Sequence, residues 1–460
     1  MTHEQYDLVV LGAGPGGSRA ALLAAQAGMT TALVEQDDLG GTCLNWGCIP
    51  TKMLLGATAS KPLLDIQRKQ KSATGEINFS LNALQQKKDR FIKGSRQALG
   101  KQLKQAGITV LTGTGSLAGP HELEVATAEG SQSVTFKKLI IATGSTPASF
   151  PGLQADGDCV LDSSHILSLT EAPESLIIVG GGAIGLEIGD LFSRFGTQIT
   201  IVEALPHLAP SEDADIGEAL QKALKREGWT IHTGKRVSSL VTESGNAKLT
   251  FEDGTEITAA KALMAAGRVP ASTTLQLDKA GVQITSRGWI VTDNQLRAAG
   301  NIFAIGDVNG RTLLAHAAGH QARYVVSVIS GKYEEDYLPP AMPSCVYGHM
   351  EVMRAGATAK ELLESGLDVF VSRAALIANP IAQSYGTTQG FVKAVWIKKE
   401  ESFELRGMAA TGHGVSHLIG AATIMVEQRW QQKNIHDIIY AHPTLDEALE
   451  AALSAPLEAL

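Results

Sequence analysis

The sequence predicts an α/β protein whose sheets are largely parallel. Three segments of the 460-residue chain indicate this, because each is an apolar strand followed by a glycine-rich turn. They begin at Tyr6 (YDLVVLGAGPGG), Ser175 (SLIIVGGGAIG) and Lys261 (KALMAAGRVP), and the first two continue into a helix. Buried strands that alternate with helices are typical of parallel sheets. The first two segments also resemble each other, which indicates a duplicated fold rather than a short-period repeat.

The composition is that of an ordinary globular protein, with 44% hydrophobic and 19% charged residues. The formal net charge of −8 disfavours nucleic-acid binding, which usually needs a basic surface. No run of about 18 apolar residues indicates a membrane span. The first strand begins at Tyr6, too early to leave room for a removable leader. We therefore expect a cytoplasmic protein whose thiols are kept reduced.

The first glycine-rich turn has the spacing of a dinucleotide-binding loop. Gly12, Gly14 and Gly17 form G-x-G-x-x-G directly after the strand. The first glycine allows a tight turn, the second lets the backbone approach a pyrophosphate, and the third packs helix against strand. The helix that follows offers free N–H groups and its positive dipole end to phosphates. Glu35 ends the next strand, where a carboxylate can bind a ribose hydroxyl.

The same pattern recurs in the second segment. Gly180, Gly182 and Gly185 repeat the spacing, and Glu203 stands at the corresponding strand end. Two copies predict two Rossmann-like domains, each with its own dinucleotide. A carboxylate at Glu203 would bind a free 2′-hydroxyl and repel a 2′-phosphate, and the stretch 203–210 (EALPHLAP) lacks the arginine that an NADP site favours. We therefore expect NAD at the second site.

The chain changes character from about residue 341. A proline-rich joint (LPPAMP, 338–343) precedes strands such as FVKAVWI, and we expect two late helices around 413–431 and 434–455. This part is interpreted as a separate α+β domain. The predicted division is 1–150 for the first part of the first domain, 151–270 for the second, 271–340 for a central part that completes the first, and 341–460 for the last. The lysine-rich stretch 87–105 is expected to be the exposed face of a long helix.

Two of the four cysteines lie close together in the segment GGTCLNWGCIPTK (40–52). A structural zinc site needs about four Cys or His ligands, and the chain has no second cysteine pair. Two inert buried residues are the other alternative, and a redox disulfide is the interpretation we favour. On a regular helix Cys43 and Cys48 would be about 7.5 Å apart along the axis, whereas a disulfide needs Cα atoms within about 4.4–6.8 Å. The segment should therefore bend, as Asn45 and Gly47 permit. Pro50 suits a first helical turn, which would place Cys48 near a helix amino terminus and favour its thiolate.

These motifs together resemble those of the FAD-dependent pyridine nucleotide–disulfide oxidoreductases, most closely the members that oxidise dihydrolipoamide. The resemblance runs nearly end to end. Besides the two glycine loops and the cysteine segment, it includes ATGSTP (142–147), AAGRVP (265–270), AIGDV (304–308), LLAHAA (313–318) and AHPTLDE (441–447). It implies two Rossmann-like domains and a carboxy-terminal α+β dimerisation domain.

The resemblance also implies which residues line the cofactors. The residues expected at FAD are Gly12, Gly14, Gly16, Gly17, Glu35, Thr42, Lys52, Gly115, Thr143, Gly144, Asp307 and Ala315. The residues expected at NAD are Gly180, Gly182, Gly185, Glu187, Glu203 and Gly267. No metal is expected.

The resemblance assigns roles to the reactive groups. Cys48 would be the thiolate against the flavin and Cys43 the thiol that exchanges with substrate. His442 would be the acid–base residue and Glu447 its orienting partner, while Lys52 and Glu187 would form a pair beside the flavin. In the family the histidine serves the cysteines of the other subunit, which implies a homodimer. The expected partner is a lipoyl-bearing protein: that of a 2-oxoacid dehydrogenase complex, that of the glycine cleavage system, or a specialised lipoate-binding protein.

Four positions depart from the family pattern: Trp46, Met350, Ile381 and His417. They are explained either by sequence drift or by a specialised lipoyl partner. Two other functions are possible. The first is a reductase of another small disulfide such as glutathione; Glu203 opposes it, because that branch of the family usually takes NADPH. The second is a non-catalytic flavoprotein scaffold, which would need none of the reactive groups. Cys159 and Cys345 are expected to be buried and inert.

Overall fold

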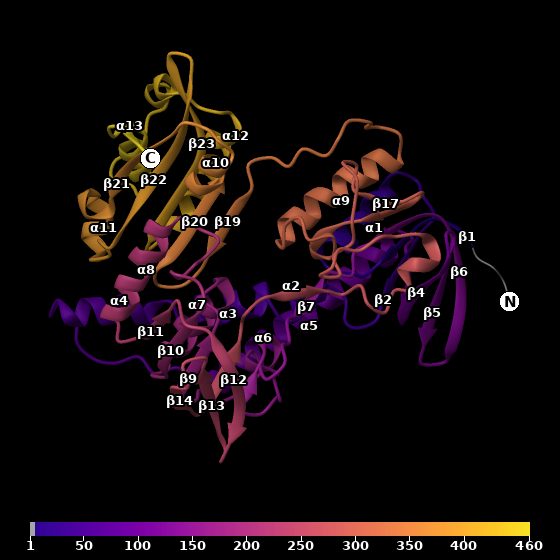
Figure 1. The fold of residues 1–460 in the computed structure, drawn as a ribbon, viewed down its shortest axis with the longest axis horizontal. Coiled ribbons are helices and arrows are strands. Elements are labelled where there is room, and N and C mark those ends of the chain that lie inside the picture. The colour runs from indigo at the N-terminus through magenta and orange to yellow at the C-terminus, as the bar shows by residue number, and fades with distance from the viewer. Residues whose placement is uncertain (1–4) are drawn as a thin grey trace. The chain divides into compact units, whose positions relative to one another are not determined.

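The structure is a computed structural model that describes residues 5–460. The chain forms two compact units that alternate along the sequence (Figure 1). Unit 1 consists of Met1–Pro50, Gln86–Ala148 and Gly267–Leu338, and unit 2 of Thr51–Gln85, Ser149–Ala266 and Pro339–Leu460. Each segment of a unit is thus completed by segments far away in the sequence.

Unit 1 is built on an eight-stranded sheet. Its strands follow the order β17-β18-β6-β1-β2-β3, and the β4–β5 hairpin extends it from β6. The strands are β1 (Gln5–Leu11), β2 (Thr31–Glu35), β3 (Thr109–Thr112), β4 (Thr114–Gly119), β5 (Glu122–Thr127), β6 (Gly130–Ile141), β17 (Arg297–Ala299) and β18 (Ile302–Ala304). Strand β1 runs parallel to both β2 and β6. Its side chains alternate between two cores, with Val9 and Leu11 on one face and Leu8 and Val10 on the other, as expected of a strand covered on both sides.

Helices and short elements complete unit 1. The helices α1 (Pro15–Gln26) and α9 (Ala315–Ile329) pack against each other. The remaining elements are α2 (Gly41–Asn45), a two-stranded ribbon of β7 (Ser145–Pro147) and β16 (Arg268–Pro270), and the 3₁₀ turns η1 (Leu277–Ala280) and η2 (Gly306–Asn309). Two helices cross from one unit to the other along the chain: α3 (Cys48–Ala57) and α5 (Leu81–Gln105). Helix α5 confirms the long helix predicted for the lysine-rich stretch.

Unit 2 contains a second parallel sheet, of five strands in the order β11-β10-β9-β15-β8. These strands are β8 (Val160–Leu161), β9 (Ser175–Val179), β10 (Gln198–Glu203), β11 (Thr230–Thr233) and β15 (Lys261–Met264). The antiparallel strands β12 (Val237–Glu243), β13 (Asn246–Phe251) and β14 (Glu256–Ala259) form a separate small sheet. The helices of this part are α4 (Ser60–Lys69), α6 (Ser163–Ile166), α7 (Ala183–Ser193) and α8 (Ala214–Arg226).

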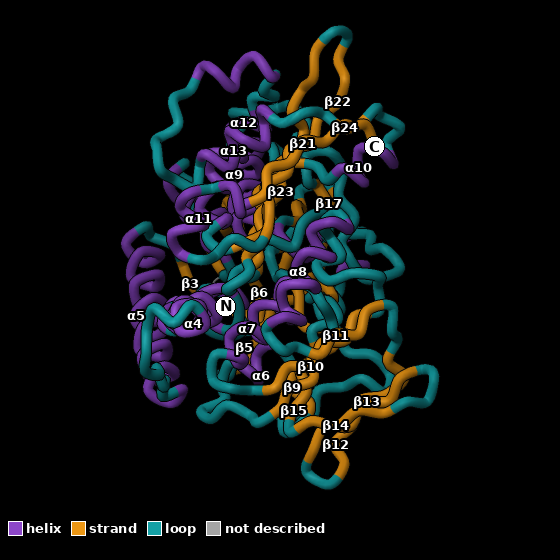
Figure 2. The backbone as a smooth tube through the Cα atoms, turned by 90° about the vertical axis from the view of Figure 1, so that its left-hand side faces the viewer, coloured by secondary structure: helices purple, strands orange, loops and turns teal. Residues whose placement is uncertain are grey.

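The carboxy-terminal part of unit 2 is a six-stranded antiparallel sheet flanked by helices (Figure 2). The strands are β19 (Pro343–Val346), β20 (Glu351–Gly356), β21 (Val369–Ala375), β22 (Gly390–Lys399), β23 (Ser402–Gly412) and β24 (Glu458–Ala459). The helices are α10 (Ala359–Glu364), α11 (Pro380–Tyr385), α12 (Ile419–Glu427) and α13 (Glu447–Ser454), with 3₁₀ turns η3 (Leu376–Ala378), η4 (Val415–Leu418) and η5 (Gln432–Asp437). The two Rossmann-like folds and the α+β domain confirm the predicted fold class.

The late helices are shorter than predicted. The helix expected around 434–455 is wrong over its first half, because η5 ends at Asp437 and α13 begins only at Glu447. Pro443 gives the physical reason, since proline has no N–H and keeps the preceding residue out of the helical region. The helix expected around 413–431 is the 3₁₀ turn η4 followed by α12.

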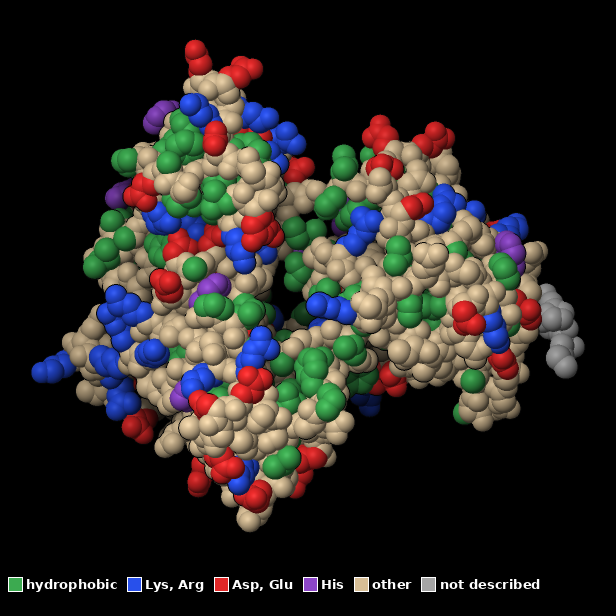
Figure 3. Space-filling model, in the orientation of Figure 1, with side chains coloured by type: hydrophobic (Ala, Val, Ile, Leu, Met, Phe, Trp, Pro, Cys, Tyr) green, Lys and Arg blue, Asp and Glu red, His purple; other side chains and the backbone are tan. Residues whose placement is uncertain are grey.

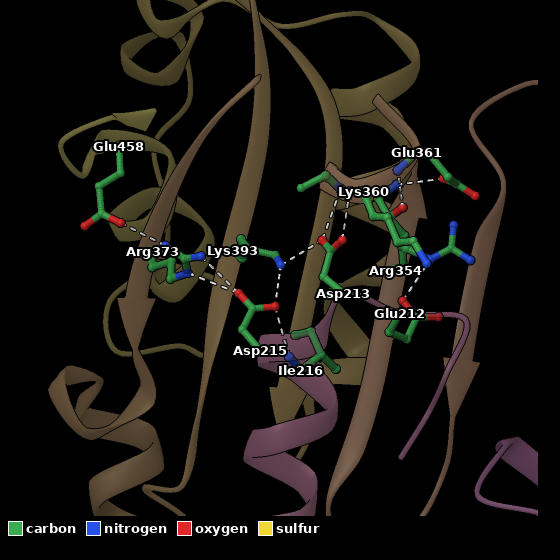
Figure 4. A network of polar contacts seen from close by, with 12 residues as sticks. Glu212, Asp213, Asp215, Ile216, Arg354, Lys360, Glu361, Arg373, Lys393 and Glu458 are labelled. Carbon is green, nitrogen blue, oxygen red and sulfur yellow. Dashed lines mark hydrogen bonds and ion pairs between the residues drawn. The ribbon is translucent and has the colours of Figure 1, made fainter. Parts of the chain in front are cut away.

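A polar network fastens α8 to the carboxy-terminal sheet within unit 2 (Figure 4). Lys393 of β22 is 1% exposed, and its Nζ lies 2.8 Å from Asp213 Oδ2 and 2.6 Å from Asp215 Oδ1. The Asp213 carboxylate also accepts the backbone N–H groups of Ala359 and Lys360 at the start of α10. Because one buried cation joins two carboxylates, the start of α8 is held against both β22 and α10.

Among the described residues, no helix is both long and apolar enough to cross a membrane.

Candidate active site

Both glycine loops have the geometry that a bound dinucleotide needs. A Cβ on Gly12 (φ +101°) would lie 2.5 Å from the Ala142 carbonyl oxygen, and one on Gly17 1.8 Å from that of Gly12. In the second loop, a Cβ on Gly180 (φ +113°) would lie 2.4 Å from the Ala265 carbonyl oxygen, and one on Gly185 2.0 Å from that of Gly180. Only glycine fits these four positions, and each loop leads directly into a helix.

The helix starts behind these loops are open to an anion. Helix α1 follows Gly14 as its N-cap and has Pro15 at its first position, and α7 follows Gly182. Neither start has a side-chain cap among the described residues, and a Cβ on Gly182 would meet nothing within 4 Å. The uncapped N–H groups suit the pyrophosphates of FAD and NAD.

The two acidic residues at the strand ends are held in the same way. Glu35 Oε2 accepts the N–H of Ala13 at 2.7 Å, and Glu203 Oε2 accepts the N–H of Gly181 at 2.7 Å. The second oxygen of Glu203 accepts the N–H of Leu205 at 2.8 Å. Each carboxylate is thus fixed against its own glycine loop, with lone pairs left for ribose hydroxyls. The sequence predicted the positions of both acids but not this anchoring by the loop.

Other residues expected at FAD come together in unit 1 around a network that the sequence did not predict. Ser145 Oγ donates to Asp307 Oδ2 at 2.6 Å, and Arg268 binds Ser145 through its Nε and a terminal nitrogen. The Thr143 hydroxyl donates to the Ala271 carbonyl at 2.7 Å. Ser145 and Arg268 belong to the motifs ATGSTP and AAGRVP, which were the available signal.

The remaining expected residues of unit 1 lie at turns and element ends. Thr42 lies in α2, Gly144 (φ +72°) precedes β7, and Ala315 is the first residue of α9. A Cβ on Gly115 of β4 would lie 2.6 Å from Leu11 Cδ1, so that the Leu11 side chain would have to shift to admit it. Gly267 belongs to unit 1, whereas the other residues expected at NAD belong to unit 2.

The cysteine segment is broken between its two cysteines, as predicted. Helix α2 ends at Asn45 and α3 begins at Cys48. The buried Asn45 amide fixes the break, because it donates to the carbonyls of residues 38, 39 and 41 and accepts Arg96 Nε at 2.6 Å. Cys43 is half-buried and Cys48 is exposed. Cys48 stands at the amino terminus of α3, where the helix dipole favours a thiolate.

Lys52 of α3 forms the expected pair with Glu187 of α7, with Nζ 2.6 Å from Oε2. The backbone N–H of Tyr347 donates to the other oxygen of Glu187 at 3.2 Å, and the Lys52 ammonium lies 4.9 Å from the centroid of the Tyr347 ring. Burial raises the pKa of Glu187 above its ordinary value, while Lys52 and the Tyr347 N–H oppose that rise. Sequence reasoning missed Tyr347, which positions both members of the pair.

The remaining cysteines differ from each other. Cys159 is 2% exposed, as expected. The expectation that Cys345 is buried is wrong, because it is half-buried on the edge strand β19 and hydrogen-bonds the side chain of Tyr347. Burial raises the pKa of the Cys345 thiol to about 11. This thiol is therefore protonated at neutral pH.

The predicted histidine–carboxylate pair forms in unit 2. His442 Nδ1 lies 2.8 Å from Glu447 Oε1, and Glu447 Oε2 accepts the N–H of Thr444 at 2.9 Å. The hydrogen bond from His442 lowers the pKa of Glu447 below its usual value, so that this residue is a carboxylate at neutral pH. Because a carboxylate only accepts, Nδ1 donates a proton to this hydrogen bond, and Nε2 of the 72% exposed side chain is the nitrogen that can exchange a proton with a substrate.

These features define a class of protein. Two loops shaped for dinucleotides, a cysteine pair at a helix amino terminus and an oriented histidine are the parts of a flavoprotein disulfide oxidoreductase. The chain matches the family described as pyridine nucleotide-disulphide oxidoreductase over residues 6–322, and the dimerisation domain of that family over residues 342–453. It belongs to this family of FAD- and NAD(P)-binding oxidoreductases with a redox-active disulfide, and its dimerisation domain supports a homodimer.

Full-length relatives narrow the comparison. The chain is 38% identical to a dihydrolipoyl dehydrogenase of Chlorobaculum tepidum, over 98% of this chain and 97% of that protein. It is 37% identical, over the same shares, to a dihydrolipoyl dehydrogenase of Mycobacterium tuberculosis. Among solved structures, the HOCl-induced flavoprotein disulfide reductase RclA of Escherichia coli is similar with a TM-score of 0.86 and 28% identity, over 98% of this chain and 99% of that one.

Proposed function

We propose that this protein is a dihydrolipoamide dehydrogenase, which oxidises a dihydrolipoyl dithiol and delivers the electrons to NAD⁺. The observation that carries the proposal is the Glu447-oriented imidazole together with the broken cysteine segment, in a chain 37–38% identical over its length to two dihydrolipoyl dehydrogenases. The lower identity to RclA makes another disulfide the weaker candidate substrate.

The proposed chemistry begins with the proton. His442 Nε2 takes a proton from one substrate thiol, and the resulting thiolate attacks Cys43 Sγ in the oxidised Cys43–Cys48 pair. The disulfide bond breaks, and its electron pair leaves as the Cys48 thiolate at the start of α3. The second substrate thiol then displaces Cys43, which closes the lipoyl disulfide and leaves the Cys43 thiol. The substrate has lost two electrons and the cysteine pair has gained them.

The cofactors complete the reaction. FAD supplies the two-electron chemistry that connects the reduced cysteines with NAD⁺. The residues proposed to hold FAD are the first glycine loop, Glu35 and the Ser145–Asp307–Arg268 network, and those proposed to hold NAD are the second loop and Glu203. Lys52, fixed by Glu187 and Tyr347, would place a positive charge beside the flavin. The anchored Glu203 carboxylate favours NAD over NADP, because it would repel a 2′-phosphate.

The test is an assay of purified, flavin-loaded protein. We expect rapid reduction of NAD⁺ by dihydrolipoamide, little reduction of NADP⁺, and no oxidation of NADH by glutathione disulfide. Cys48→Ser should abolish the reaction, whereas Cys159→Ala, which changes a cysteine outside the site, should retain it. A flavin that NADH reduces in a protein without dihydrolipoamide activity would instead point to a different disulfide substrate.

The proposed physiological partner is a lipoyl-bearing protein in a reducing compartment such as the cytoplasm. Trp46 lies between the two cysteines and is half-buried, while His417 is exposed on η4. These departures from the family pattern support a specialised partner. The measurement is turnover with free dihydrolipoamide and with several lipoyl proteins, where equal rates throughout would contradict a specialised partner.

A further inference from the structure

A cavity of about 350 Å³ lies within unit 2 and contains none of the residues assigned to the cofactors or to catalysis. Its wall is formed by α4, by α7, by the end of α8, and by segments of the carboxy-terminal domain near residues 349, 387 and 413. Met350, one of the departures from the family pattern, belongs to this wall. A volume of this size suits a small organic or inorganic molecule.

Polar atoms without partners are concentrated in this wall. Six buried side-chain nitrogen or oxygen atoms lack a hydrogen-bond partner among the described residues, and three of them belong to wall residues: Arg194 Nε, His349 Nδ1 and His413 Nδ1. The two imidazole rings lie 5.7 Å apart. Buried polar groups almost always have a partner, so that such a concentration indicates a polar species or ordered water among these residues.

The charges of the wall favour an anion. Lys61 and Asp65 pair with each other, as do Arg194 and Asp190. Lys69 and Arg226 also belong to the wall, and neither forms an ion pair within 4 Å in the described part of the chain. Basic side chains gather over α4 in the space-filling view (Figure 3). Glu227 is the one wall carboxylate left without a Lys or Arg partner among these residues.

We propose that this cavity binds a small oxyanion, a phosphate or a carboxylate. Lys69 and Arg226 would supply the positive charge and donate hydrogen bonds to the oxygens of the anion. Arg194, which belongs to the wall, donates to the carbonyl of Leu55 in α3 and to the hydroxyl of Thr58 directly after α3. The occupant would therefore touch the side chain that holds the helix of Cys48.

Glu227 gives the site a pH signature. Its Oε1 lies 3.5 Å from His349 Nε2, and it faces Asp190 and Arg194 of α7 and Lys69 of α4. Burial, with repulsion from Asp190, raises the pKa of Glu227 to about 7, although Lys69 and Arg194 oppose the shift. Since the neutral carboxyl does not repel an anion, binding should be tighter at pH 6 than at pH 8.

Calorimetric titration of the flavin-loaded protein tests the proposal, with sulfate and malonate as probes of the two ligand types. Saturating NAD⁺ keeps the second glycine loop occupied, so that sulfate cannot bind there. We expect at least one probe to saturate with a Kd of about 1 mM or lower. Sulfate remains a dianion between pH 6 and pH 8. A change in its affinity over this range therefore comes from the protein.

Three variants identify the cavity as the site. Lys69→Gln combined with Arg226→Gln should weaken binding by about tenfold or more. Lys222→Gln combined with Lys225→Gln, which changes two exposed cations of α8 outside the wall, should leave it within about twofold. Glu227→Gln should tighten binding and remove the pH dependence, a gain that a damaged structure would not produce. No saturation by either probe below about 20 mM, or equal loss in the control variant, would overturn the proposal.

Discussion

At the residue scale, the Glu447 carboxylate should set the basicity of His442. Glu447→Gln keeps the shape of the side chain but removes the charge that stabilises the protonated imidazole. We expect kcat with dihydrolipoamide to fall by about 10²-fold. The acid limb of the kcat/KM profile should move to lower pH, because the variant lacks the negative charge that favours protonation of the base.

A matched control is available one residue earlier. Asp446→Asn removes an exposed carboxylate that makes no side-chain cap at α13, and it should leave both rate and profile unchanged. A Glu447→Gln protein with the wild-type acid limb would show that the pair does not tune the base.

The Tyr347 ring gives a second test at this scale. Tyr347→Leu removes the ring beside the Lys52 ammonium but keeps the backbone N–H that binds Glu187. A cation–π contact of a partly exposed lysine contributes about 0.5–1 kcal/mol, so that kcat should fall only a few-fold. If Lys52 lies beside the flavin as proposed, the flavin absorbance of the reduced protein should change as well, because the charge is less fixed. An unchanged flavin spectrum would assign Tyr347 to stability alone.

The sequence predicted those site residues that belong to a motif or stand at the end of a strand. It predicted Glu35 and Glu203 at strand ends, and the resemblance supplied the pairing of His442 with Glu447. It missed Tyr347, because the contact with Glu187 joins positions 160 residues apart and leaves no periodic trace in the sequence.

At the element scale, the break between α2 and α3 depends on Asn45. Asn45→Ala leaves Arg96 Nε and three carbonyls of residues 38–41 without their side-chain partner. We expect the free energy of unfolding to fall by about 2–3 kcal/mol, since buried groups lose their hydrogen bonds. Urea denaturation measures this, with Gln36→Ala at an exposed position as the control. A loss below about 0.5 kcal/mol would contradict the assigned role.

The bend of this segment was predictable, whereas its fixation was not. The bend follows from the span that a disulfide allows, but the partners of Asn45 come from the preceding loop, from the first residue of α2 and from α5. The late helix 434–455 failed for the opposite reason. The predicted helix ignored Pro443, which keeps the residue before it out of the helical region.

At the scale of the whole molecule, Lys393 joins the second Rossmann-like fold to the carboxy-terminal domain. Lys393→Met removes a buried cation and leaves Asp213 and Asp215 facing each other, which should cost about 3–5 kcal/mol of unfolding free energy. Lys398→Met, at an exposed position of the same strand, should change stability by less than about 0.5 kcal/mol. Chemical denaturation compares the two.

The same variant should change the response to acid. Burial favours a raised Asp213 pKa, but the Lys393 hydrogen bond and charge, with two backbone N–H groups, bring it below its usual value. A lowered folded-state pKa contributes stability above the unfolded-state value and loses it as pH falls through the folded one. Without Lys393 the Asp213 pKa rises, so that acid unfolding should begin at higher pH than in the wild type. An unchanged acid midpoint would show that Lys393 does not set this pKa.

The last prediction concerns the pairing of two chains. If His442 serves the cysteines of its partner, as the family resemblance implies, then two inactive variants should complement each other. In a mixed dimer of Cys48→Ser with His442→Gln, one site carries both changes and the other carries neither. The two proteins are unfolded and refolded together, and random exchange makes about half of the dimers mixed. Each mixed dimer has one intact site of two, so that about a quarter of the wild-type activity should return. Refolding each variant alone is the control. If His442 instead acted on the cysteines of its own chain, every site in the mixture would carry one change, and no activity would return.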